Sequence, residues 1–301
     1  MSNQRVTPTA ASPAGRLAEV RSWGYQLQDL DIDDASAAPL DLLVIDYALD
    51  GSEETALSPA DLERLKQRRD GGERLVYAYI SVGEAETYRY YWREEWKDAP
   101  PSWLLSENPD WPGNHMVAYW DEDWQAILFG GAGCYIDRIA AAGFDGLYLD
   151  RCDVHDDIAA REKRVAKARG DLEGDMTAFI TRLSAYVRRN HPRLGIIMQN
   201  AEHLLEHAEV RHAIDGIAKE ELLYGESGGA RRNAKATIEE NRRNLDRMKR
   251  DGKAVLAVEY IDDPTKRQQA IDEIQALGYV AYVSRQNRDL ATLETGAAPM
   301  A

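Results

Sequence analysis

Five short apolar runs of the chain end in, or just before, a carboxylate side chain. These acidic residues are Asp46, Glu84, Asp150, Glu220 and Glu259. A carboxylate at the tip of a buried strand loses part of its hydration, a cost that proteins usually accept for binding or acid/base chemistry rather than for stability. Two such acids on neighbouring strand ends can cleave a glycosidic bond, because one protonates the leaving oxygen while the other attacks the sugar or activates water. The pattern therefore predicts an active site where these strand ends meet.

We expect Asp150 and Glu220 to be the catalytic pair. Side chains alternate along a strand, so Glu220 lies on one face and Lys219 and Glu221 lie on the other. If the Glu220 face lines a barrel, it brings an acid beside Asp150, whereas the Lys219 face would suit a lyase that forms a Schiff base. A glycine turn that holds phosphate after the seventh or eighth strand would normally accompany that lysine. The corresponding turns, 259–263 and 284–287, contain no glycine, which favours the carboxylate interpretation.

The order of apolar runs along the chain indicates which fold positions these acids. Eight runs predict strands, at 22–28, 41–47, 75–82, 146–150, 194–199, 214–220, 254–260 and 279–284. Helical patterns separate most of them, at 58–70, 123–142, 173–190, 203–212, 230–251 and 264–277. Hydrophobic strands alternating with helices indicate a parallel sheet covered on both faces. Eight such units predict one α/β domain, a closed (β/α)8 TIM barrel with its site at the C-terminal strand ends.

An open, doubly wound sheet is the main alternative fold, but it would need a glycine-rich turn after the first strand, and 27–31 contains no glycine. We place the barrel domain at residues 19–292 and expect disordered tails at 1–18 and 293–301. The first tail is rich in Pro, Ala, Ser and Thr and lacks the charged start and apolar centre of a signal peptide. The sequence as given therefore predicts no export signal, and it leaves localisation and oligomeric state open.

A long connection follows the third predicted strand, from Glu84 to about Trp124, and it holds six of the seven tryptophans. Aromatic rings above the C-terminal strand ends would give flat platforms suited to sugar rings. The alternative, which we weigh equally, is a loop that folds its aromatic side chains onto one another.

Composition excludes several classes of partner. The net charge is −15, with 52 acidic against 37 basic residues, so a nucleic acid or an anionic membrane surface would be repelled. No stretch approaches 18 apolar residues, so we expect no membrane span. Cys134 and Cys152 are interpreted as free thiols, because the chain has neither a CxxC motif nor a Cys/His quartet. The segment from His203 to His207 matches HxxEH, but no third ligand is apparent, so we predict no metal and no cofactor.

Several motifs together resemble a known family, glycoside hydrolase family 114, the endo-α-1,4-polygalactosaminidase-like proteins. The resemblance extends over about residues 22–287 and is carried by 79–86, 88–92, 107–114, 119–121 and 143–150. Some members carry a label relating them to cysteinyl-tRNA synthetase, but the HIGH and KMSKS-type elements of such enzymes are absent here. Similar proteins are often exported.

The resemblance implies a (β/α)8 barrel that cuts α-1,4 linkages inside galactosamine-containing polymers, with Asp150 and Glu220 matching the acids after the fourth and sixth strands. The family tends to have a small residue after the second acid, whereas this chain has Glu221, so which glutamate acts stays open. Free amines would make such a polymer cationic, in agreement with the acidic composition. A non-catalytic polysaccharide-binding barrel remains the alternative, followed by the lyase that uses Lys219. We expect substrate to contact Asp46, Tyr47, Glu84, Tyr119, Trp120, Asp153, Asn200, Glu221, Glu259 and Arg285.

Overall fold

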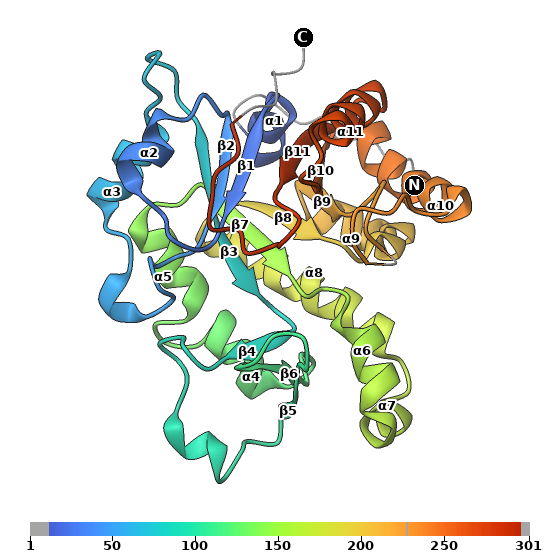
Figure 1. The fold of residues 1–301 in the computed structure, drawn as a ribbon. Helices are drawn as coiled ribbons and strands as arrows, with labels where there is room; N and C mark the ends of the chain where they lie inside the picture. Colours follow the sequence, from blue (N-terminus) through green and yellow to red (C-terminus); the bar gives the residue numbers. More distant parts are fainter. Residues whose placement is uncertain (1–11, 227, 296–301) are drawn as a thin grey trace, which may run out of the picture.

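The computed structural model describes residues 12–226 and 228–295. Eight parallel strands form its main sheet, in the order β1-β2-β3-β7-β8-β9-β10-β11 (Figure 1). Their bounds are β1 (Trp23–Gln26), β2 (Leu42–Ile45), β3 (Leu75–Ser81), β7 (Gly146–Asp150), β8 (Gly195–Gln199), β9 (Gly216–Glu220), β10 (Ala254–Tyr260) and β11 (Val280–Ser284). Each strand lies within the range predicted for it, and the (β/α)8 barrel is confirmed.

Helices occupy the connections between these strands and surround the sheet (Figure 1). The α-helices are α1 (Pro13–Ala18), α2 (Ile32–Ala37), α3 (Pro59–Lys66), α4 (Glu122–Leu128), α5 (Tyr135–Ala142), α6 (Val154–Arg161), α7 (Lys163–Arg169), α8 (Leu172–Asn190), α9 (Ala208–Ala213), α10 (Lys235–Arg250) and α11 (Pro264–Ala276). Short 3-10 helices are η1 (Glu53–Thr55), η2 (Glu94–Lys97) and η3 (Glu202–Glu206). The helix predicted at 123–142 is two helices, because Gly130 and Gly133 adopt positive φ angles of 87° and 65° between them.

The barrel is nearly closed at the seam between β1 and β11. Within the described residues these strands form no backbone ladder, but Trp23 Nε1 donates to the carbonyl oxygen of Val280 at 3.1 Å. The chain after β11 then returns across the seam, where Leu27 N donates to Leu290 O at 2.9 Å. Packing and the returning segment therefore complete the barrel wall.

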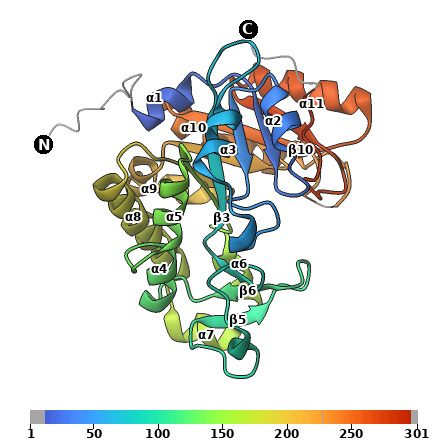
Figure 2. The ribbon, with the colours of Figure 1, turned by 90° about the vertical axis from the view of Figure 1, so that its left-hand side faces the viewer.

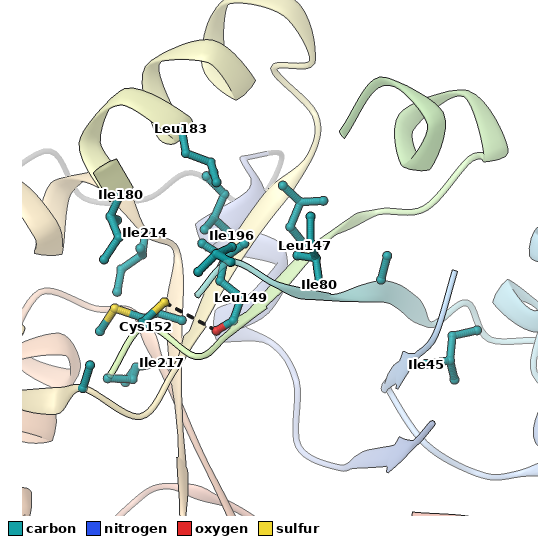
Figure 3. Packing of buried hydrophobic residues seen from close by; sticks show 14 of the residues in the cluster. Ile45, Ile80, Leu147, Leu149, Cys152, Ile180, Leu183, Ile196, Ile214 and Ile217 are labelled. Atoms are coloured by element: carbon teal, nitrogen blue, oxygen red, sulfur yellow. Dashed lines mark hydrogen bonds between the residues drawn. The ribbon is translucent and has the colours of Figure 1, made fainter. Parts of the chain in front are cut away.

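Two separate cores lie on the two faces of the strands. Aromatic rings fill the barrel interior, among them Trp23, Tyr25 and Tyr148, and the Tyr25 and Tyr148 ring centroids are 5.2 Å apart. The outer layer, between strands and helices, is mainly aliphatic. Figure 3 shows Leu147 and Leu149 of β7 within this outer layer. Alternation along β7 therefore directs Tyr148 and Asp150 to the interior.

The described structure extends into both of the predicted tails. The Ser12 side chain caps α1 by accepting from Gly15 N, and Leu17 of α1 is fully buried in the interior core. At the other end, Leu293 packs against the core. Apolar side chains in both segments therefore extend the ordered domain beyond 19–292. The remaining predicted tail residues, 1–11 and 296–301, lie outside the described residues.

An insertion after β3 builds a small antiparallel sheet. Its strands are β4 (Glu84–Glu86), β5 (Leu104–Glu107) and β6 (Asn114–Val117), in the order β4-β6-β5. Figures 1 and 2 place this sheet and α7 at the end of the molecule opposite α1. Most aromatic side chains of the insertion pack together, as in the contact between Trp96 and Trp103 at 5.0 Å. The self-packing alternative therefore describes most of these rings. No helix in the part of the chain that the structure describes is long and apolar enough to span a membrane.

Candidate active site

A pocket of about 600 Å³ lies over the C-terminal ends of the barrel strands. Asp150 and Glu220, the last residues of β7 and β9, both line it. Its other lining residues are Tyr25, Leu27, Gln28, Asp29, Asp46, Leu49, Asp50, Gly51, Tyr79, Glu84, Glu86, Tyr88, Trp111, Pro112, Asn114, Arg151, Asp153, Gln199, Asn200, Glu221, Tyr260, Arg288 and Leu290.

Asp150 and Glu220 are joined by a shared hydrogen-bond donor. The Nε2 atom of Gln199 donates to Asp150 Oδ1 at 2.8 Å and to Glu220 Oε2 at 2.7 Å. The two carboxylate oxygens that accept from it can be no farther apart than these two lengths together, about 5.5 Å. The predicted convergence of the two acids is therefore present.

Each acid receives further hydrogen bonds from its own side of the pocket. Asp150 accepts from Tyr79 Oη at 2.8 Å and from the backbone N–H of Arg151 at 2.7 Å. Glu220 accepts from Asn200 Nδ2 at 3.0 Å and from the hydroxyl of Tyr260. The donors are uncharged, so they orient both carboxyl groups without supplying a full positive charge.

The environment raises the pKa of Asp150 from 3.8 to about 7. Burial is the larger cause, and the nearby charge of Glu220 adds to it. Asp150 can therefore hold a proton near neutral pH, as a group that acts as general acid requires.

Lys219 lies on the opposite face of β9 from Glu220. Its Nζ atom is 3.3 Å from Glu202 Oε1, and it is not among the residues that line the pocket. Ala218, one residue before it, packs in the barrel interior, as alternation requires. The structure thus contradicts the Schiff-base alternative.

The backbone turns sharply after each of three central strands. Arg151, Asn200 and Glu221, which follow β7, β8 and β9, have φ angles of 62°, 54° and 53°. L-residues rarely adopt this left-handed conformation, and such strain is concentrated at functional sites. The turns leave Asp150, Gln199 and Glu220 as the outermost residues of their strands.

A buried arginine links other predicted site acids to the insertion. Arg89 makes two bonds to Asp46, at 2.6 and 2.7 Å, and one to Glu86 at 2.6 Å. Glu84 accepts from Asn108 Nδ2 at 2.8 Å and from Arg151 Nε at 2.9 Å, while burial raises its pKa. These ion pairs fix the wall of the pocket, since a buried carboxylate needs such partners.

The structure brings seven of the twelve predicted site residues to the pocket: Asp46, Glu84, Asp150, Asp153, Asn200, Glu220 and Glu221. Glu221 pairs with Arg288, and burial raises the pKa of Glu221. Of the two glutamates, only Glu220 contacts the amide group that also contacts Asp150.

Five predicted contacts are placed elsewhere. Tyr47 packs edge-on against Tyr135 in the outer core, and Arg285 binds Glu294 at the surface. Tyr119 is buried and donates to Leu172 O at 2.6 Å, whereas the Trp120 ring packs under Arg169. Residues 119 and 120 follow β6, and the chain there runs into the outer layer rather than over the barrel.

Glu259 is the fifth residue placed elsewhere. It is fully buried on the outer side of β10 and accepts backbone N–H groups of Leu223 at 2.7 Å and Tyr224 at 3.1 Å. Burial raises its pKa to about 8. Glu259 therefore shapes the loop after β9 and does not line the pocket.

Some pocket residues were missed from the sequence. The sequence prediction rests mainly on acidic residues and omits Gln199, Tyr79 and Tyr260. Alternation along their strands nevertheless directs all three side chains to the interior. From the insertion, Tyr88 and Trp111 line the pocket with exposed fractions of 46% and 51%. These two rings are the part of the aromatic loop that faces the site.

The histidine and cysteine motifs lie outside the pocket. His203 Nε2 is 2.9 Å from His155 Nε2, and His207 contacts Glu173 at 3.1 Å. Among the described residues, no group of three or more His, Cys, Asp or Glu side chains is arranged to hold a metal ion. Both cysteines are free and buried, and Cys152 lies in the outer layer with its Sγ atom directed at Leu149 O (Figure 3). A buried thiol of this kind, whose pKa burial raises, is a poor nucleophile.

Fold and site together define a barrel of the glycoside hydrolase type. Glycoside-hydrolase family GH114 matches residues 4–297, so the chain belongs to this family and is a glycosidase. A Methanocaldococcus jannaschii protein described as uncharacterized is 38% identical over 287 residues, covering 91% of this chain and 78% of the relative. An uncharacterized Thermotoga maritima protein is 34% identical over 292 residues, covering 94% and 86%.

Among solved structures, the glycoside hydrolase domain of PelA from Pseudomonas aeruginosa has a similar fold. Its TM-score is 0.64 at 21% identity, and the match covers 91% of this chain and 97% of that domain. At this identity the likeness supports the barrel fold and not a substrate.

Proposed function

We propose that the chain is an endo-acting hydrolase of α-1,4 linkages in galactosamine-containing polysaccharide, with Asp150 and Glu220 as its acid/base pair. The observation that carries this proposal is the position of both carboxyl groups on one amide nitrogen at the C-terminal end of the barrel. One acid protonates the leaving oxygen while the other attacks the sugar carbon. Retaining glycosidases hold their acids about 5–5.5 Å apart and inverting ones about 6.5–9.5 Å apart. The upper limit of about 5.5 Å between the two oxygens lies below the inverting range, which favours retention.

The charge of the pocket supports an amino sugar as substrate. Nine carboxylate side chains line it, against two arginines, Arg151 and Arg288. Such an excess of negative charge attracts polymers that carry free ammonium groups and repels acidic polysaccharides. De-N-acetylated galactosamine units therefore fit the pocket better than acetylated ones.

The shape of the lining supports cleavage within a chain. Leu290 and Arg288 come from the segment after β11, whereas Trp111 and Asn114 come from the insertion. Two segments far apart in the sequence therefore line the pocket together with Asp150, and both can contact neighbouring sugars of a polymer. The exposed ring of Trp111 offers one face for stacking on a pyranose.

The proposal is tested by incubating the protein with de-N-acetylated and acetylated galactosamine polymers and measuring product lengths by mass spectrometry. We expect mixed internal fragments from the de-N-acetylated polymer and slower release from the acetylated one. D150N and E220Q should bind the polymer but release no fragments, whereas D137N, a change at an outer-surface carboxylate, should cleave normally. Binding with no fragments from the unaltered protein would instead identify a non-catalytic polysaccharide-binding barrel.

A second measurement assigns the two roles. Azide can replace an acidic nucleophile, forming a glycosyl azide whose anomeric configuration shows which face was attacked. If azide restores activity to a variant and the glycosyl azide has inverted configuration, the residue replaced in that variant is the nucleophile. If the glycosyl azide has retained configuration, the replaced residue is the acid/base. Formation of the inverted anomer by the unaltered protein would exclude retention.

A further inference from the structure

We propose that Gln199 is a positioning residue that holds Asp150 and Glu220 in working geometry by donating one hydrogen of its side-chain amide to each acid. The inference rests on the proposed function and deepens it. Gln199 ends β8, the strand between β7 and β9, so it lies between the two acids. Its donor distances are 2.8 Å to Asp150 and 2.7 Å to Glu220.

The register of the sheet dictates this placement. Tyr148 pairs with Ile197 across β7 and β8, so Asp150 stands level with Gln199 two residues later. On the other side Gln199 pairs with Ala218, and Glu220 follows two residues on, pointing to the same interior face. Three adjacent strands therefore present an acid, an amide and an acid to one point.

The chemistry of the amide fixes its orientation. Both neighbours are acceptors when ionised, and only the nitrogen of a glutamine side chain can donate. Each of its two hydrogens is satisfied by one carboxyl group. Turning the amide over would direct its oxygen at two carboxylates, which would repel it.

The lack of charge on Gln199 matters as much as its two hydrogens. A lysine or arginine here would favour the ionised form of both acids, and neither would then keep a proton near neutral pH. The amide offsets the repulsion between the acids by hydrogen bonding, while burial still raises the pKa of Asp150. A neutral double donor is thus suited to a pair that must share one proton.

Folding stability does not explain this residue. Gln199 is 2% exposed, and its Oε1 atom is buried without a hydrogen-bond partner among the residues described. A buried acceptor left unpaired destabilises the folded state. The chain accepts that cost where the amide nitrogen serves the two acids.

The first test replaces Gln199 with methionine, which has similar length and no N–H group. We expect kcat of Q199M to fall about 10- to 100-fold with KM within about twofold, because the amide acts on the acids and not on the substrate. Each carboxylate loses a hydrogen-bond donor in Q199M. Both limbs of the pH profile of kcat/KM should therefore move to higher pH, by about one pH unit. The matched control is Q125M, since buried Gln125 donates to Tyr119 O at 2.8 Å in the outer layer. Q125M should lower the melting temperature without moving either limb.

The second test uses Q199E, which keeps the size of the side chain. Its carboxyl group can donate only when protonated, so its kcat/KM relative to the unaltered protein should fall steadily as pH rises. A constant ratio across pH, or a Q199M variant with unchanged limbs and kcat within twofold, would overturn the inference.

A readout without substrate separates this inference from the proposed function. Carbon-13 NMR of the side-chain carboxyl groups should show the titration of Asp150 moving to higher pH in Q199M. If it moves while D150N and E220Q still cleave polymer, the proposed function fails and the positioning role stands. If D150N and E220Q are inactive and the titration does not move in Q199M, the positioning role fails alone.

Discussion

Two strands of this barrel, β7 and β9, have an acid at each end, and the acids at the two ends have different partners. Asp145 and Asp215 precede the strands at the end near α1, whereas Asp150 and Glu220 close them at the pocket. The four acids have similar surroundings in the sequence, because each adjoins the same apolar strands. Only the partners of each carboxyl group distinguish one end from the other.

At the α1 end the partners are cations. Asp145 lies 3.2 Å from both Arg16 and Lys66, and Asp215 lies 2.7 Å from Arg188. Each acid also accepts a backbone N–H from the neighbouring strand. These carboxylates are neutralised and tie helices to the barrel.

At the pocket end the side-chain donors to Asp150 and Glu220 are uncharged hydroxyl and amide groups. Neutral donors orient a carboxyl group but leave its proton affinity high when it is buried. The acids at the two ends of these strands therefore differ in the charge of their partners. Under the proposed function, only the acids with uncharged side-chain donors take part in the reaction.

Neutralising one acid at the pocket end is the strongest test of the proposed difference between the two strand ends. D150N and E220Q should each lower kcat about 1,000-fold or more, because proton transfer or attack is lost, while both variants stay folded. The measurement is initial rate against polymer concentration, together with a melting curve. Either variant retaining a tenth of the parent rate would remove that acid from the mechanism.

The converse change is made at the opposite end of β9. D215N leaves Arg188 and the Ile196 N–H without their carboxylate, so the free energy of unfolding should fall by about 1–3 kcal/mol. Urea unfolding measures this loss, and kcat per folded molecule should match the parent. A large fall in kcat with unchanged stability would show that the two ends do not differ as described.

The pH dependence of stability tests whether the buried Asp150 is protonated in the folded state. The folded state keeps a proton on the buried Asp150 up to about pH 7, whereas the unfolded chain releases it near 3.8, so this group makes folding less favourable as pH rises between those values. Asparagine does not titrate, so the stability of D150N relative to the parent should rise from pH 4 to pH 7 by at least about 1 kcal/mol and then level off. Urea unfolding at several pH values tests this. If the difference in stability between D150N and the parent does not change from pH 4 to pH 7, Asp150 in the folded parent is already ionised at pH 4.

The strands and the pocket acids could be predicted because both follow local rules. Apolar runs bounded by turns gave all eight strands, and alternation beside Ala218 directed Glu220 inward. The same alternation would have corrected Glu259, because Tyr260 beside it faces the interior, but the acid alone does not reveal which face is inside.

The rest of the site depends on contacts between segments far apart in the chain. Gln199 gains its role only when β8 lies between two strands that carry acids, and an uncharged side chain gave no reason to select it. Tyr119 and Trp120 were assigned to the site because they belong to an aromatic loop, yet packing directs them to the outer layer. Trp111 of the same insertion is 51% exposed and lines the pocket, and no local sequence pattern distinguishes it from them.

The smallest expected effect comes from loosening α1 itself. Arg16 donates to Asp145 at 3.2 Å and to Arg193 O at 2.9 Å, and about a third of its side chain is exposed. R16A should therefore cost only about 0.5–1 kcal/mol of stability, since Lys66 still faces Asp145. Because none of these groups lines the pocket, kcat and both limbs of the pH profile should be unchanged, as kinetics and urea unfolding on one preparation would show. A shifted limb in R16A would mean that charge at the α1 end reaches Asp150 through the aromatic interior, and the two ends of the strands would then have to be treated as one electrostatic unit.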